Sequence, residues 1–260
     1  GPVKMALLNK PTRGQRVQAE ILVQFGDVDT LKGKAAASSM TASLLDTGTD
    51  AMSRQQIRDR LEALNAEMSI GGSGTGVSIS ISTVGKNLPE TLALGLHILK
   101  HANFPADELD EQITQTITNI KANMAEPGAL ASRALARYDN PWPADDLRYV
   151  PTFEESIERY EAIERRDVVA FHNEFYGAGN ISGAAVGSFD PEAVVQTVTD
   201  GLNDWRTAPA YSRVPDPYQP IEPTLMRINT PDKANAVFLA RLPLQIQDNN
   251  PDYPALVLGN

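Results

Sequence analysis

The chain has 260 residues, of which 42% are hydrophobic and 22% charged, and its formal net charge at pH 7 is −10. This composition is typical of a globular protein with one large domain or two smaller ones. The negative charge argues against nucleic acid or an anionic membrane surface as a partner. Because the sequence has no cysteine, disulfides and thiolate metal sites are excluded. No apolar run reaches the roughly 20 residues of a membrane span.

Taken in chain order, the apolar pattern predicts strands and helices without a run of βαβ units. Residues 3–9 and 17–25 are expected strands, and the polar segment 10–14 between them predicts a hairpin. Strict alternation over 77–83 predicts a strand with one buried face. We expect helices at 53–64, 87–100, 107–120, 133–139, 166–176, 191–202 and 252–260, a further helix ending at 45, and strands at 67–70, 181–186, 225–229 and 234–242. This order indicates an α+β fold with helices covering a mostly antiparallel sheet.

Local signals place the boundaries of the first three helices. Ser53 is followed three residues later by Gln56, and Asn87 by Glu90, which is the spacing of a capping box. Gly48 is placed to end the helix that stops at 45. The sequence therefore predicts side-chain caps at the starts of the second and third helices.

Prolines divide the chain. Five of them lie between Pro209 and Pro223 and predict an extended, semi-rigid linker. We therefore expect one domain over 1–208, a linker over 209–223 and the start of a second unit over 224–260. A strand pair and one helical turn rarely form a stable domain, so this second unit looks truncated. Because the sequence begins Gly1-Pro2 without a Met, we expect a piece of a longer protein whose targeting signals lie elsewhere.

Short motifs in a fixed order give the chain a family resemblance. They are Thr12-Arg13-Gly14, Phe25-Gly26-Asp27, Leu31-Lys32-Gly33, Gly48-Thr49, Phe104-Pro105-Ala106-Asp107-Glu108-Leu109 and Val186-Gly187-Ser188-Phe189-Asp190. The ordered set resembles the pitrilysin/insulinase family of zinc metallopeptidases, the inverzincins. The resemblance implies the fold of that family's metallopeptidase-like domains, which the mitochondrial processing peptidases share. Family members pair a catalytic and a degenerate unit around a closed chamber, and this chain is similar to the degenerate one.

The family's zinc motif, His-x-x-Glu-His, falls on a helix that here carries no zinc ligand. Ser39, Ala42 and Ser43 stand at its three places. The family's third ligand, a Glu on the fourth helix, corresponds to Asn119 or its neighbours. A catalytic zinc needs three protein ligands and an open position for water. The resemblance therefore implies no catalytic residue, metal site or cofactor in this chain, and zinc in the partner catalytic half.

The neighbours of Asn119 extend this comparison. Thr118 is no carboxylate, and Ile120 continues the apolar stripe of Ile113 and Ile117. We therefore expect the former ligand position to have become part of the core.

Histidine offers a weaker alternative site. His97 and His101 have the i, i+4 spacing of metal-binding pairs on helices, but the sequence names no third ligand. His172, between Phe171 and Asn173, is expected to be half-buried packing. Helix packing is the favoured interpretation of all three histidines. A metal-binding protein that uses His97 and His101 is a further functional hypothesis, weaker than the two given below.

Other motifs are also better explained by structure. Arg137-Tyr138 resembles the Arg and Tyr pair of family catalysis, but the family's pair lies beyond residue 260. Ser39 and Ser43 lack the motifs of a serine hydrolase, and the glycine-rich 71–76 segment lacks the Lys of a phosphate loop. The strand that follows this segment could add an extended peptide through its backbone. Its alternating residues are the candidate peptide-binding set: Val77, Ile79, Ile81 and Thr83.

The leading hypothesis is the non-catalytic half of a zinc metalloendopeptidase, which closes the chamber and binds peptide. Its expected partners are the catalytic half, fused or as a separate subunit, and a peptide substrate, with no membrane span and no nucleic acid. The chain alone is predicted to be inactive. The alternative is a peptide-binding or scaffold protein on the same fold, without a peptidase partner. Resemblance to long bacterial members favours the periplasm over the cytoplasm.

Overall fold

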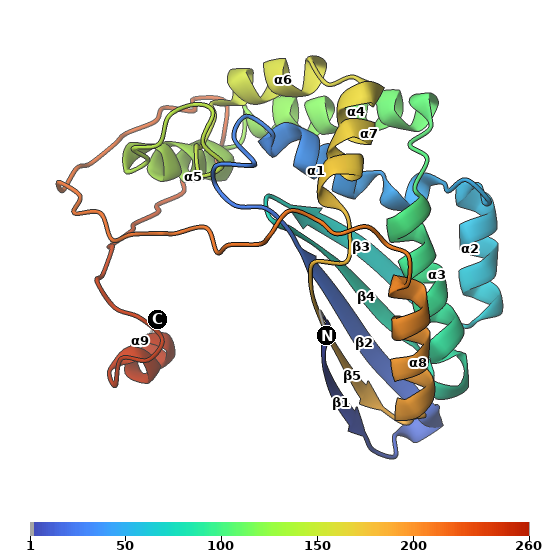
Figure 1. Cartoon of the computed structure of the whole chain (residues 1–260). Coiled ribbons are helices and arrows are strands. Elements are labelled where there is room, and N and C mark those ends of the chain that lie inside the picture. The colour runs from blue at the N-terminus through green and yellow to red at the C-terminus, as the bar shows by residue number, and fades with distance from the viewer. Residues whose placement is uncertain (1–2, 260) are drawn as a thin grey trace.

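The computed structural model describes residues 3–259. A five-stranded sheet is flanked by helices, and an extended C-terminal segment reaches away from it to α9 (Figure 1). The strands are β1 (Val3–Asn9), β2 (Arg16–Gln24), β3 (Glu67–Ser73), β4 (Gly76–Val84) and β5 (Asn180–Gly187). The α-helices are α1 (Ala35–Ser43), α2 (Arg54–Ala63), α3 (Leu88–His101), α4 (Ala106–Asn123), α5 (Pro127–Tyr138), α6 (Phe153–Glu161), α7 (Arg165–Phe175), α8 (Pro191–Leu202) and α9 (Tyr253–Gly259). Single 3-10 turns lie at Arg13–Gln15, Leu45–Thr47 and Gly85–Asn87.

The sheet has the strand order β1-β5-β2-β4-β3. β1 runs parallel to β5, and the other neighbouring strands are antiparallel. The expected α+β fold with a mostly antiparallel sheet is confirmed. The hairpin expected between the first two strands is wrong, because β5 lies between β1 and β2 and pairs with both. A Cβ at Gly183 would lie 2.6 Å from the sulfur of Met5, so this glycine makes room for β1 on β5.

The core lies between one face of the sheet and the helices α3 and α8. α3 packs against β4 and against α8, and all three elements turn apolar side chains toward one another. The buried residues include Val17, Ile21, Val23, Val77, Ile79, Ile81, Leu92, Leu96, Leu99, Val194 and Val198. The two-residue period of the strands leaves their other face without this cover, and no helix lies over it in Figure 1.

The caps confirm one predicted helix start and correct the other. Ser53 and Gln56 form the expected capping box, with both reciprocal hydrogen bonds present. Asn87 forms no side-chain cap. Its amide Nδ2 instead donates to the carbonyl oxygen of Leu64, 2.6 Å away, at the end of α2. A tertiary contact has replaced the local one, which the spacing Asn87–Glu90 cannot reveal.

The C-terminal segment is extended. Between Leu202 and Tyr253 the structure describes no helix and no strand, so the strands expected at 225–229 and 234–242 are wrong. Apolar side chains there are exposed, with Leu225 at 70% and Phe238 at 81%, and two strands without further neighbours are marginal in water. α9 matches the expected last helix as far as Gly259, and Asn260 lies outside the described residues.

No helix within residues 3–259 is both long enough and apolar enough to cross a bilayer.

Candidate functional site

The positions of the zinc motif lie on α1 and differ in burial. Ala42 is buried, with 3% of its surface exposed. Ser43 is exposed, and its hydroxyl donates to the carbonyl oxygen of Met40 at 2.9 Å within the same helix. Ser39 is half-buried, and the helix packs against β3 and α7. The small side chains of Ser39 and Ala42 let α1 lie close to its neighbours.

The position that corresponds to the third zinc ligand lies on the surface of α4. Asn119 is exposed and accepts a hydrogen bond from Nε2 of Gln115 at 3.0 Å. The hydroxyl of Thr118 donates to the carbonyl oxygen of Thr114 at 2.8 Å. Ile120 is half-buried and does not join the main core, so the expectation that it had become core is wrong. Only Leu109 is buried on α4, because this helix covers the surface of the fold.

The histidine pair gains a third group that the sequence did not indicate. The loop after Gly48 brings the carboxylate of Asp50 within 3.6 Å of His97 Nε2 and 3.4 Å of His101 Nδ1. The backbone N–H of Asp50 donates to the carbonyl oxygen of His101 at 3.0 Å, which fixes the loop to the end of α3. Burial lowers the pKa of His97, and the nearby His101 acts in the same direction.

These three side chains do not have the geometry of a metal centre. The two imidazole rings are stacked, with centroids 4.7 Å apart and planes 30° from parallel. A metal ligates imidazole in the plane of the ring, so stacked rings cannot both direct a lone pair at one ion. Within residues 3–259, no group of three or more His, Asp or Glu side chains could hold a metal ion.

The remaining candidates have structural contacts. His172 is buried, with 6% of its surface exposed, where half-buried packing was expected. Arg137 donates to the carbonyl oxygen of Val150 and to the Tyr149 hydroxyl. The Tyr138 hydroxyl donates to the carbonyl oxygen of Glu222 at 3.0 Å, in the extended C-terminal segment. Arg137 and Tyr138 therefore bind different segments and do not act as a pair.

The predicted peptide-binding strand is not at an edge of the sheet. β4 pairs with β2 on one side and β3 on the other, so its backbone cannot add a further strand. Val77, Ile79, Ile81 and Thr83 are buried and point toward the helices. The strand-addition hypothesis for these residues is therefore wrong. The edges of the sheet are β1 and β3.

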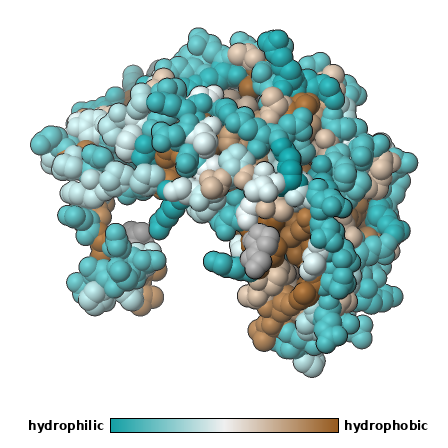
Figure 2. All heavy atoms as spheres, in the orientation of Figure 1, coloured by the Kyte–Doolittle hydropathy of each residue, from teal (hydrophilic) through white to brown (hydrophobic). Residues whose placement is uncertain are grey.

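The opposite face of the sheet is accessible instead, and we call it the open face. Two rows of side chains cross all five strands in register. The first row is Leu8, Val186, Gln18, Ser82 and Glu67, and the second is Ala6, Ala184, Glu20, Ser80 and Ser69. Together they line a shallow groove of about 780 Å³. A hollow separates the sheet from the extended C-terminal segment, and apolar side chains are visible at the part of the sheet beside it (Figure 2).

The side chains of the open face divide into an apolar and a polar half. Leu8 and Val186 lie opposite each other on β1 and β5 and are both exposed. Small hydroxyl side chains and the carboxylates of Glu20 and Glu67 occupy the β2, β4 and β3 side. The sequence signal was the alternation of Ser78, Ser80 and Ser82 with apolar residues, which indicated one lightly covered face but not the rows across strands.

Comparisons with known proteins agree with this description. Residues 162–260 match a family model described as the peptidase M16 inactive domain. The fold is similar to a peptidase M16 inactive domain from Pseudomonas fluorescens, with a TM-score of 0.67 and 20% identity over 84% of this chain and 52% of that one. It is also similar to a protease from Helicobacter pylori, with a TM-score of 0.65 and 15% identity over 83% of this chain and 50% of that one. A comparison with curated proteins gives no match.

The fold is thus similar to that of solved M16 peptidase structures, and the positions that correspond to the zinc ligands carry Ser39, Ala42, Ser43 and Asn119. The family match over residues 162–260 and the similar folds agree with the resemblance stated from the sequence. The chain spans about half the length of the solved structures it matches.

Proposed function

We propose that this chain is the non-catalytic half of an M16 zinc peptidase, which closes the substrate chamber and binds peptide on the open face. Zinc and the chemistry belong to the catalytic half, as a fused segment or a separate subunit. The observation that carries the proposal is the accessible five-stranded face, with its groove of about 780 Å³ on a fold of this family.

The chemistry of the open face favours an extended, cationic peptide. The serine and alanine side chains in the middle of the face are short, so the backbone of a bound peptide can approach the sheet closely. The carboxylates of Glu20 and Glu67 offer partners to Lys or Arg side chains, and the net charge of −10 attracts cations over longer range. Leu8 and Val186 offer apolar contact at the other end of the groove.

Binding to the open face is tested with a fluorescent, unstructured cationic peptide and the chain alone, by anisotropy. Ser80→Arg places a long, charged side chain in the middle of the face and is expected to weaken binding by about tenfold or more. Gln196→Arg is the matched control, because Gln196 is exposed on α8 on the other side of the sheet. Equal affinities of the two variants would contradict the proposed face.

The non-catalytic role is tested on the same preparation. We expect neither stoichiometric zinc by elemental analysis nor chelator-sensitive peptide hydrolysis by the chain alone. Either result would overturn the proposal. Addition of a catalytic M16 half from the same genome is expected to give hydrolysis that Ser80→Arg reduces.

The extended segment supports a second proposal, about domain organisation. Apolar side chains beyond the linker are exposed, as in Phe238 at 81%, Leu242 at 78% and Leu258 at 88%. Exposed apolar side chains in such number indicate an interface or an incomplete core. We propose that 209–223 is a linker and that 224–260 begins a second unit, which the family match over 162–260 includes.

A scaffold role without any peptidase partner is the alternative, and the same exposed apolar residues would then contact an assembly partner. The discriminating observation is a His-x-x-Glu-His motif upstream in the full-length protein or in a co-purifying subunit. Its presence favours the peptidase, and an assembly without such a subunit favours the scaffold.

A further inference from the structure

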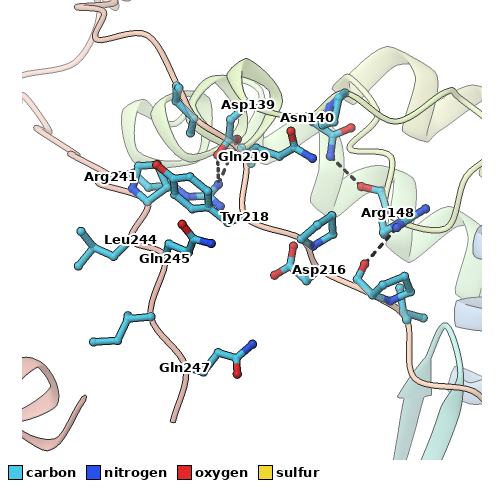
Figure 3. A pocket seen from close by; sticks show the side chains of 18 of the residues that line it. Asp139, Asn140, Arg148, Asp216, Tyr218, Gln219, Arg241, Leu244, Gln245 and Gln247 are labelled. Carbon is cyan, nitrogen blue, oxygen red and sulfur yellow. Dashed lines mark hydrogen bonds and ion pairs between the residues drawn. The ribbon is translucent and has the colours of Figure 1, made fainter. Parts of the chain in front are cut away.

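The first anchor of the extended segment is an arginine whose side chain is already fixed. The guanidinium of Arg148 donates through Nε and Nη2 to the two carboxylate oxygens of Asp146, at 2.9 and 2.8 Å. It lies over the ring of Trp142, 3.3 Å from the ring centroid. Its remaining nitrogen, Nη1, donates to the carbonyl oxygen of Pro215 in the linker at 3.0 Å (Figure 3). Since Arg148 is held by two neighbours, it loses little conformational freedom when it binds the linker.

The second anchor lies further along the extended segment, at Arg241. Arg241 Nη1 lies 2.9 Å from the carboxylate of Asp139, whose side chain is only 8% exposed. Asn140, the next residue, donates from Nδ2 to the carbonyl oxygen of Arg148 at 2.8 Å, which ties the two anchors together. Figure 3 shows these groups around one cavity of about 1070 Å³, with the two arms on either side.

Both anchors come from one short stretch of the chain. Asp139, Asn140 and Arg148 belong to the connection between α5 and α6, and Asp146 within it is buried. This connection is also joined to α6, because Arg159 donates to the carbonyl oxygen of Ala144 at 2.8 Å. It is therefore a fixed part of the first unit, and it contacts the extended segment at two places.

We propose that this connection is a clamp, in which Arg148 holds the linker at Pro215 and Asp139 holds Arg241. Gly26 already holds the start of the segment, since its N–H donates to the Pro209 carbonyl oxygen and its carbonyl oxygen accepts from the Ser212 N–H. The clamp adds contacts further along the chain, and so sets how a following unit is presented to the open face. Arg148 donates to a backbone carbonyl of the segment, and the hydrogen-bonded carboxylate of Asp146 and, after it, that of Asp216 in the segment favour the charged guanidinium by raising the pKa of Arg148. The clamp is independent of peptide binding and of zinc, and it would act in the scaffold alternative as well.

The clamp is tested by hydrogen exchange on the 260-residue chain. The variants are Arg148→Lys, which loses the two-point bond to Asp146 while keeping the charge, and Arg241→Gln. The control is Arg166→Gln, because Arg166 is exposed and pairs only with its neighbours Glu164 and Asp167. The hydrogen-bonded amides nearest the two contacts are those of Ser212, which donates to Gly26, and Ile246, which donates to Leu244. We expect exchange at Ser212 in Arg148→Lys and at Ile246 in Arg241→Gln to become roughly fivefold faster, as loss of one net hydrogen bond implies.

Distances give a second readout. The chain has no native cysteine, so spin labels at Gln196→Cys and Asp248→Cys report the position of the arm relative to α8. We expect a narrow distribution in the otherwise unchanged chain and in Arg166→Gln, and a broad one when Arg148→Lys and Arg241→Gln are combined. Exchange and distances equal to those of the control would overturn the clamp. If Arg148→Lys fails to fold, Arg241→Gln alone decides, since Arg241 is largely exposed.

Discussion

Nε2 of His172 lies 2.8 Å from the carbonyl oxygen of Leu99, and the bond joins α7 to the last turn of α3. The carbonyl can only accept, so Nε2 carries the proton. Carbonyls in the last turn of a helix have no partner within the helix. The imidazole supplies one, and it also packs between the rings of Phe104 and Tyr176. His172 is therefore buried where the end of α3 packs against α7.

Replacing His172 tests this role. His172→Phe keeps a planar aromatic ring, although a larger one, and leaves the Leu99 carbonyl without a partner. We expect a loss of about 1–3 kcal/mol in the free energy of unfolding. Urea unfolding followed by circular dichroism measures it. His101→Ala, at a more exposed position of α3, is the control and is expected to stay within about 0.5 kcal/mol.

The same residue predicts a dependence of stability on pH. Burial lowers the pKa of His172, and nearby Arg206 and His101 act in the same direction. Its pKa is thus lower in the folded state than in the unfolded one, so acid protonates the unfolded chain first. We expect stability to be unaffected by this group above its unfolded pKa, near 6.5, and to fall as the pH drops below that value. Urea titrations at falling pH should show a smaller decline in His172→Phe, and an equal decline would contradict the assignment.

The buried place of Ala42 predicts that the zinc motif cannot simply be restored. Ala42→Glu would put a carboxylate where only 3% of the side chain is exposed, and we expect a loss of about 3 kcal/mol or more. Ser43→Glu is the matched control, since Ser43 lies on the same helix and is exposed. Thermal unfolding of both variants tests the difference.

A triple variant with Ser39→His, Ala42→Glu and Ser43→His should bind no stoichiometric zinc, because Asn119 offers no carboxylate.

The stacked histidines give a prediction that separates packing from metal binding. Asp50 raises the pKa of His97 against the larger effect of burial. Asp50→Asn should therefore lower the pKa of His97 further, as measured by NMR titration of the ring. Metal content should be the same in the unchanged chain and in a variant with His97→Ala and His101→Ala. Zinc that disappears in the double variant would restore the metal hypothesis.

Local patterns in the sequence predicted local features, and the errors concern contacts between distant residues. The pattern of apolar residues predicted β2 and β4, and the three-residue spacing of Ser53 and Gln56 predicted the capping box of α2. The hairpin before β2 failed because β5, more than 150 residues away, provides the neighbour for both strands. The cap predicted at Asn87 is absent for the same reason, because the side-chain amide of Asn87 donates to the distant carbonyl oxygen of Leu64. The open face needs the register of five strands, which no single segment contains.

Gly187, at the end of β5, gives a prediction about how closely β5 approaches β2. Gly187 has φ 137°, and a Cβ there would lie 2.4 Å from the carbonyl oxygen of Arg16 on β2. That oxygen belongs to a strand paired on both sides, so it cannot move away without breaking the ladder. Gly187→Ala should cost about 3 kcal/mol or more. Gly14→Ala is the control, because Gly14 has φ 71° but nothing within 4 Å of its Cβ position, and we expect about 1 kcal/mol from the backbone alone. Equal losses for the two variants would show that strain at φ, and not contact with β2, determines the cost.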